Sequence, residues 1–197
     1  VPVGAATAND ADLVPEYLKT KFSDKSAELD KIAKVGKRTE PDLGAIANLH
    51  PDLILINNTN KKEEVYDSLS KIAPTVVTEG TGHNWKQDFL MIASALGATS
   101  KAEEMLKDYE DKAKKLGEKA GQEKTFSFLY AAGDRTRVYA KSSFVGSICE
   151  DASLARPAAQ QEGKTSIDLS SENLDQADGD YLFYGVQGGD ESKLTSE

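Results

Sequence analysis

The sequence has few of the residues that build disulfide frameworks and metal centres. It contains one cysteine, Cys149, and two histidines, His50 and His83, among 197 residues. A single thiol excludes a disulfide framework and a site with several thiolate ligands. Cys149 instead falls with apolar neighbours on one face of a predicted helix, which is the pattern of core packing. We therefore expect no metal held by the protein itself; a site of two histidines with carboxylates stays open as an alternative.

Long apolar runs and an excess of positive charge are also absent. No run of 18 apolar residues occurs, so no transmembrane helix is predicted, and the sequence does not open with the charged and apolar regions of a signal peptide. The 24 basic and 33 acidic residues give a formal net charge of -9. This balance argues against nucleic acid or an anionic membrane surface as the main partner, because both require a dense positive footprint.

The common catalytic motifs are missing as well. The sequence shows no G-x-S-x-G elbow, no G-x-x-x-x-G-K loop and no H-E-x-x-H helix. We therefore predict that the chain is not an enzyme and carries no cofactor. An α/β enzyme of unknown reaction stays open as the alternative from another class, since the 33 carboxylates could include an acid/base pair.

Short apolar runs alternate with helical patterns, which predicts an α/β fold with mainly parallel sheets. Strands are expected at residues 1–5, 52–57, 75–78, 125–131, 137–140 and 181–184, and helices at 13–20, 41–49, 61–72, 85–96, 142–151 and from 171 onward. A capping box from Ser100 to Glu103 predicts one longer helix, ending near Ala120, with an apolar stripe that includes Met105 and Leu116. We therefore predict two α/β lobes, residues 1–98 and 122–197, joined by a long helix at 99–121.

The segment VGKRTEPDLGAIANLHPDLILI, residues 35–56, is the most informative part of the sequence. It predicts a strand that ends at a glycine, a helix that starts at Thr39-Glu40-Pro41, and a second strand, with Arg38 at the first turn. Parallel α/β sheets bind ligands at the carboxyl ends of their strands. Arg38 offers five donors in a planar fork, which suits a ligand rich in oxygen atoms. The alternative is a surface arginine that pairs with Glu40 or Asp42.

Other candidates for ligand binding lie at predicted strand ends and helix starts. Arg137 and Tyr139 share one side of a strand with Arg135, and the helix that follows begins at Ser142 and Phe144, where free N–H groups favour anionic oxygen. A solvated strand face, and a packing role for Trp85, stay open as alternatives. We expect the two lobes to meet in a shallow cleft that includes the turn 57–60. The candidate ligand-binding residues are Arg38, Asn57, Thr81, His83, Trp85, Arg137, Tyr139, Ser142 and Phe144.

Several segments, in order, resemble one family of transport proteins. The segments VGKRTEPDL, ANLHPDLIL, YDSLSKIAPTVV and ALGATSKAEEMLKDYE resemble the substrate-binding proteins of ABC importers, in their ferric-siderophore group with the class III fold. The resemblance implies two α/β lobes joined by one helix. It also implies a monomeric, extracytoplasmic protein, periplasmic or anchored to the membrane as a lipoprotein upstream of Val1, that captures a ferric siderophore and delivers it to an ABC permease for iron uptake. A binder of cobalamin, haem or a metal ion with the same fold stays open as the alternative.

The sequence departs from the family pattern at several places. Family members have a strand and helix before the position of Val1 and a further αβ unit after Glu197, so we expect this chain to be a piece of a longer protein. Residues 57–60 replace the aromatic residues of hydroxamate binders, which leaves the siderophore class open.

Docking on the permease is a further property that the resemblance implies. Family members present one glutamate from each lobe to the permease, and Glu172 matches that position in the second lobe. Gly44 occupies the position in the first lobe. Either Glu40 or Asp42 would therefore have to substitute there, or this contact is lost. A helix-capping role for Glu172 stays open as the alternative.

Overall fold

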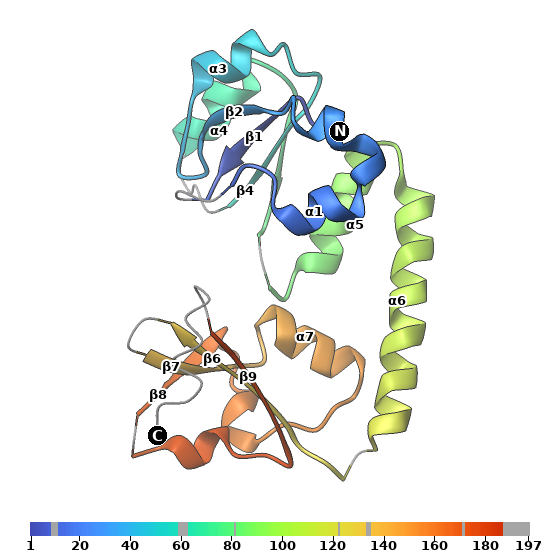
Figure 1. The fold of residues 1–197 in the computed structure, drawn as a ribbon, viewed down its shortest axis with the longest axis vertical. Coiled ribbons are helices and arrows are strands. Elements are labelled where there is room, and N and C mark those ends of the chain that lie inside the picture. The colour runs from blue at the N-terminus through green and yellow to red at the C-terminus, as the bar shows by residue number, and fades with distance from the viewer. Residues whose placement is uncertain are drawn as a thin grey trace. The chain divides into compact units, whose positions relative to one another are not determined.

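A computed structural model of the chain describes residues 1–8, 12–58, 63–80, 82–121, 123–132, 135–170 and 172–186. The chain divides into two compact units, residues 1–80 and 81–197 (Figure 1). The three-part division at 98 and 121 stays a prediction. The helices of residues 85–120 belong to the second compact unit.

The described part of the first unit contains two small sheets and several short helices. β1 pairs in parallel with β2, β2 pairs antiparallel with β3, and β4 pairs in parallel with β5. One buried cluster lies under both sheets: it joins Val35 of β2 and Ile54 of β4 to Ile46 of α3 and Leu69 of α4. The elements are β1 (Gly4–Thr7), α1 (Glu16–Lys21), the 3₁₀ helix η1 (Ser23–Lys25), α2 (Ser26–Leu29), β2 (Ala33–Lys37), β3 (Glu40–Pro41), α3 (Leu43–Asn48), β4 (Ile54–Asn57), α4 (Glu63–Ser70) and β5 (Thr75–Thr78).

The local structure around Arg38 differs from the predicted helix start. Gly36 pairs with Pro41, so Arg38 and Thr39 form the two-residue turn of a hairpin between β2 and β3. Gly36 has φ +88°, and a Cβ there would lie 2.7 Å from the backbone nitrogen of Asp42, so only glycine fits this turn. Helix α3 begins two residues later than predicted, because Asp42 is its N-cap and accepts a hydrogen bond from the Ala45 N–H at 2.9 Å.

The described residues of the second unit form three α-helices and one four-stranded sheet in the order β8-β7-β6-β9. β6 and β9 are parallel, whereas β7 is antiparallel to both of its neighbours. Leu129, Val138 and Ala177 form the buried centre of one face of this sheet. The elements are α5 (Trp85–Ala95), α6 (Thr99–Ala120), β6 (Phe126–Ala132), β7 (Arg135–Tyr139), α7 (Phe144–Asp151), η2 (Ala158–Gln161), β8 (Ser166–Leu169), η3 (Leu174–Ala177) and β9 (Tyr181–Val186).

Several predicted boundaries and one cap are wrong. The first strand lies at Gly4–Thr7, since Pro2 lacks an N–H for the ladder. The long helix begins at Thr99 with Ala98 as its N-cap and no side-chain cap, so the capping box from Ser100 does not form. The helix expected from residue 171 is the four-residue 3₁₀ segment η3. Strand β8 was not predicted. Cys149 is 2% exposed on α7, which confirms its packing role.

A carboxylate joins the starts of the parallel strands β6 and β9. Asp180 accepts hydrogen bonds from the Thr125 N–H at 2.8 Å, from its hydroxyl at 3.0 Å and from Lys124 Nζ at 2.9 Å. The N–H of Asp180 donates back to Thr125 Oγ1 at 3.0 Å. These hydrogen bonds, first that of the Thr125 backbone N–H and then that of Lys124, lower the pKa of Asp180 to about 2.

The lowered pKa of Asp180 predicts a defined loss of stability in acid. A carboxyl whose pKa is lower in the folded state stabilises the fold above its unfolded pKa of about 4, and this contribution is lost as the pH falls through the folded value. We expect Asp180→Asn to lower the urea concentration at the unfolding midpoint at pH 7. Between pH 4 and about 2, the midpoint of this variant should fall less than that of the parent protein. Asp175→Asn, at an exposed carboxylate of η3, is the matched control. An unchanged acid decline in Asp180→Asn would contradict the assignment.

Candidate functional site

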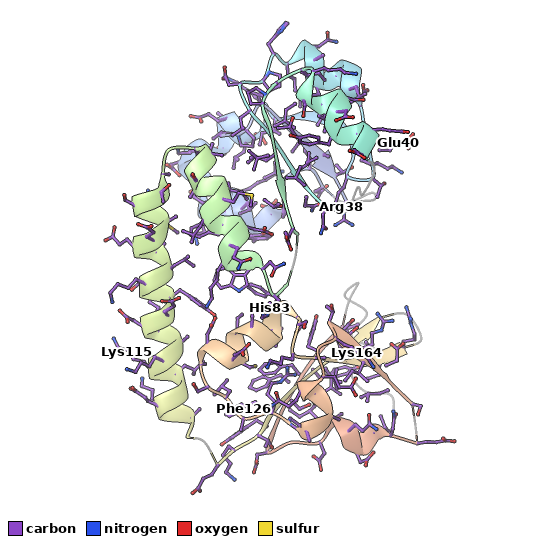
Figure 2. All side chains as sticks on the ribbon, turned by 180° about the vertical axis from the view of Figure 1, so that it is seen from behind. Arg38, Glu40, His83, Lys115, Phe126 and Lys164 are labelled. Carbon is purple, nitrogen blue, oxygen red and sulfur yellow. The ribbon has the colours of Figure 1, made fainter. Side chains whose placement is uncertain are left out.

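The carboxyl ends of the strands in the first unit bring Arg38 and Asn57 to one groove. The Arg38 N–H donates to the Thr7 carbonyl at the end of β1 at 2.9 Å, and the Asn58 N–H donates to the Thr78 carbonyl at the end of β5 at 3.0 Å. Arg38 and Asn57 both line an otherwise mainly apolar groove of about 480 Å³. Figure 2 shows the Arg38 side chain at the edge of this unit.

The guanidinium of Arg38 is exposed and forms no ion pair with Glu40 or Asp42 in the part of the chain that the structure describes. The carboxylate of Asp42 instead caps α3. Glu40 is exposed on β3 and is labelled beside Arg38 in Figure 2. The surface ion pair considered as the alternative for Arg38 is therefore not formed, and its five donors remain available to a ligand.

In the second unit, the start of α5 lies against the start of α7. A Cβ on Gly82 would lie 3.2 Å from the Ser142 carbonyl oxygen, and the rings of Trp85 and Phe144 are 5.7 Å apart in an edge arrangement. His83 is exposed beside this contact (Figure 2), and Phe144 is 49% exposed. The structure thus brings His83, Trp85, Ser142 and Phe144 together at one place.

Trp85 of α5 is held by packing on two other helices, α6 and α7. Its Nε1 donates to Ser147 Oγ of α7 at 3.1 Å, and its ring meets Tyr109 of α6 edge-on with a centroid distance of 5.0 Å. The packing role considered as an alternative is therefore present. The ring remains half-buried, so an edge of it can still meet a ligand.

A polar clamp beside Trp85 fixes the same three helices. Lys86 Nζ lies 2.5 Å from Asp151 Oδ1, and the Tyr109 hydroxyl donates to Asp151 Oδ2 at 2.7 Å. Burial, followed by the hydrogen bond to Asp151, raises the pKa of Tyr109, which keeps the phenol protonated as a donor. Asp151 therefore links α5, α6 and α7.

The turn before α7 has fewer free donors than the sequence suggested. The N–H groups of Lys141 and Ser142 donate to the carbonyls of Glu162 and Lys164 at 3.2 and 2.9 Å. Ser143 caps the helix by accepting from the Gly146 N–H at 2.8 Å. The side chain of Ser142 is half-buried. The donor that Ser142 can still offer to a ligand is therefore its hydroxyl.

The basic and aromatic stripe of β7 is largely satisfied within its own sheet. Arg137 forms a hydrogen-bonded ion pair with Asp168 of β8, and Arg135 lies 3.8 Å from the same carboxylate. Asp168, followed by Tyr130, raises the pKa of Arg137. Tyr139 stacks on Tyr130 with ring centroids 4.5 Å apart. These contacts favour the alternative considered for this stripe, a solvated strand face, over a basic patch that is free to bind a ligand.

Three predictions cannot be placed with the others. Thr81 and residues 59–60 lie outside the described residues. Glu172 is exposed and precedes the 3₁₀ segment η3, whose N-cap is Asn173. Four 3₁₀ residues have little macrodipole, so the capping role considered for Glu172 loses its basis.

Sequence reasoning missed a buried arginine. Arg156 is 8% exposed; it donates to the Tyr139 carbonyl and, at 2.6 Å, to Gln160 Oε1, and Gln160 donates to Ser127 Oγ at 2.6 Å. Burial lowers the pKa of Arg156. The four-residue spacing of Arg156 and Gln160 was the only available signal.

The described residues offer neither a metal centre nor a membrane span. Among them, no group of three or more His, Cys, Asp or Glu side chains is placed to hold a metal ion. No helix in the same ranges combines the length and the apolar character needed to cross a bilayer.

Comparison with known proteins places the chain in a family. The sequence profile described as a periplasmic binding protein matches residues 5–196, so the chain belongs to the periplasmic binding protein family. It is 33% identical over 201 residues to the protein named probable siderophore-binding lipoprotein YfiY of Bacillus subtilis (strain 168), an alignment that covers 98% of this chain and 59% of that protein.

Solved structures agree with this assignment. The crystal structure of SirA from Staphylococcus aureus has a TM-score of 0.82 at 30% identity and covers 100% of this chain and 76% of that one. SirA complexed with staphyloferrin B gives a TM-score of 0.80 at 30% identity, with 100% and 71% covered. The family and the α/β fold class predicted from the sequence are confirmed. The chain spans about three fifths of the length of YfiY.

The clamp at Asp151 yields a prediction about stability. Asp151→Asn removes the charge that faces Lys86 and weakens the bond from Tyr109, so we expect a loss of about 1–3 kcal/mol in the free energy of unfolding, measured by urea denaturation. Asp111→Asn is the matched control, since it removes a carboxylate from an exposed ion pair with Lys107 on α6 and should change stability far less than Asp151→Asn does. Equal effects of the two substitutions would show that Asp151 is not a clamp.

Proposed function

We propose that the chain is the core of an extracytoplasmic solute-binding protein that captures a ferric siderophore and delivers it to an ABC permease for iron uptake. Membership of the periplasmic binding protein family, the printed name of YfiY and the staphyloferrin B complex of SirA support this proposal. The observation that carries it is Arg38, a guanidinium without a carboxylate partner among the described residues, which lines the groove at the strand ends of the first unit.

The chemistry of this ligand suits the side chains that are present. A siderophore already saturates the ferric ion with its own oxygen atoms, so the protein needs hydrogen-bond donors and apolar surface rather than metal ligands. The described residues supply Arg38 as donor and the Trp85 and Phe144 rings as surface. Binding and release of an intact chelate requires no bond to be broken, so the protein acts as a carrier without catalysis or cofactor.

The candidate binding residues are found in each of the two units. In the first unit these are Arg38 and Asn57. In the second unit His83, Trp85 and Phe144 are the stronger candidates, because they meet at one exposed place. Arg137, Tyr139 and Ser142 are weaker, since their charges or donors are engaged within the sheet and the adjoining turn. Thr81 is retained on sequence grounds alone.

Fluorescence titration tests the proposed function directly. Trp85 is the single tryptophan of the chain, so any change in emission reports on its surroundings. Ferric hydroxamate, catecholate and citrate-type chelates, with cobalamin and haem for comparison, would be added to the protein. A saturable change with one ferric chelate is expected. Saturation by cobalamin or haem alone, or by none of the panel, would overturn the proposal.

Substitution of Arg38 tests directly whether this side chain binds the ligand. Arg38→Ala removes a charge-assisted donor and leaves ligand oxygens unpaired, a loss of about 1.5–3 kcal/mol. We expect affinity for the cognate chelate to fall about tenfold to a hundredfold, measured by the same titration, with an unchanged thermal midpoint. Lys34→Ala, at an exposed cation of the same strand, is the control. Equal affinities of Arg38→Ala and the parent would exclude Arg38 from the site.

Delivery to the permease is tested through Glu172. We propose that Glu172 in the second unit and Glu40 in the first face basic residues of the permease, and that a monomer, tethered by a lipid anchor outside residues 1–197, docks there. Glu172→Arg would place like charges across the interface. We expect it to abolish siderophore-dependent iron uptake in cells, with chelate affinity intact. Cells that carry Asp175→Arg, a substitution three residues further along the same exposed segment, should take up iron normally. Normal uptake by Glu172→Arg would remove this residue from the docking surface.

A further inference from the structure

The segment between η3 and β9 holds the one place in the sequence where a glycine follows an aspartate or an asparagine, Asp178-Gly179. A glycine has no Cβ, so it leaves the backbone nitrogen after the aspartate without steric protection. Asp178 is exposed and Gly179 is half-buried. Solvent therefore reaches both the carboxyl group and the peptide bond that joins the two residues.

The backbone nitrogen of Gly179 lies next to this carboxyl group. The Gly179 N–H donates to Asp178 Oδ1 at 2.9 Å, which keeps the nitrogen beside the carboxyl carbon Cγ. Holding a nucleophile next to its target lowers the entropic cost of their reaction. The neighbouring amides are bonded elsewhere: that of Asp178 donates to the Asp175 carbonyl at 3.1 Å. The amide of Asp180 donates to Thr125 Oγ1 at 3.0 Å. Among the described residues, the Gly179 amide therefore bonds only to the side chain that it can attack.

We propose that Asp178 is a site of spontaneous isoaspartate formation, a covalent modification of the backbone. The Gly179 nitrogen attacks Cγ of the protonated Asp178 carboxyl group and forms a C–N bond. The carboxyl hydroxyl leaves with the proton of the nitrogen as one water, and a five-membered succinimide ring results. One water then opens the ring. Opening at the backbone carbonyl carbon gives isoaspartate, in which the main chain runs through Cβ and Cγ, whereas opening at Cγ restores aspartate. The two steps consume no net water and need no oxidant or metal.

Isoaspartate displaces the start of β9. It adds one carbon to the main chain between Asp178 and Gly179, a C–C bond of about 1.5 Å. Just beyond, the Asp180 carboxylate accepts from the Thr125 N–H at 2.8 Å, and the Tyr181 N–H donates to the Thr125 carbonyl at 3.0 Å. N–H···O bonds form over a narrow range of about 2.7–3.2 Å, so a shift of this size breaks them. Conversion therefore weakens the pairing of β9 with β6, and it does so whichever ligand the protein binds.

Ageing of the purified protein tests the proposal. The protein would be kept at 37 °C and pH 7 and sampled over several weeks. Peptide mapping by mass spectrometry, resistance to cleavage by Asp-N protease and methylation by protein isoaspartyl methyltransferase would locate isoaspartate. We expect it at Asp178, preceded by a peptide that is lighter by one water. Asp175 is exposed in the same segment but is followed by Gln176, so it should convert at least about tenfold more slowly. Equal conversion at the two sites, or none at Asp178, would overturn the proposal.

Two substitutions at Asp178 check the chemistry and its effect on β9. Asp178→Glu keeps the charge but needs a six-membered ring, so it should stay unconverted. Asp178→Asn replaces the hydroxyl by an amine that leaves as ammonia, so it should form isoaspartate faster than the parent. We expect the converted parent to melt at least about 2–4 °C below the fresh protein, with no such loss in aged Asp178→Glu. Equal ageing of Asp178→Glu and the parent, or conversion that leaves the thermal midpoint unchanged, would overturn the assigned role of this site.

Discussion

The carboxylate of Asp151 determines the arrangement of helices in the second unit. It accepts from Lys86 of α5 and from Tyr109 of α6 while it sits in the last turn of α7. A half-buried carboxylate with two donors is satisfied only if all three helices keep their places. The start of α5 is thereby held against the start of α7, and Trp85 meets Phe144 there. The positions of Trp85 and Phe144 therefore depend on a clamp whose carboxylate lies at the opposite end of α7 from Phe144.

The segment around Arg38 shows that a motif can identify a family and still mislead about local structure. The position of Arg38 beyond the end of a strand followed from the sequence, and so did the strands and helices with clear periodicity, including β5 and α5. The hairpin did not, because Pro41 is equally suited to a first helical turn and to a strand edge. The positive φ of Gly36 favours the hairpin. The sequence shows that a glycine stands at this position, but not which φ it adopts.

Tertiary contacts account for most of what the sequence could not show. Met105 and Leu116 were expected in the packed stripe of α6, yet they are 54% and 50% exposed. Gly117 makes the close approach instead, since a Cβ there would lie 1.9 Å from the Ala152 carbonyl oxygen. Helical spacing selects apolar residues and overlooks a glycine that lets two backbones meet. The antiparallel pairing of β7 had a clearer signal, because only two residues separate it from β6.

The distribution of the four arginines explains why one of them stands apart. Arg156 is buried and bonded to backbone and amide oxygens, and Arg135 and Arg137 share the carboxylate of Asp168. The charges of Arg135 and Arg137 are thus offset by a neighbouring carboxylate, and Arg156 is only 8% exposed, so its guanidinium is withdrawn from the surface. Arg38 has no such partner among the described residues and lies at the strand-end rim. In a chain with a net charge of -9, long-range attraction does not favour an anionic chelate, so its capture must rest on short-range hydrogen bonds of the kind that an unpaired guanidinium supplies.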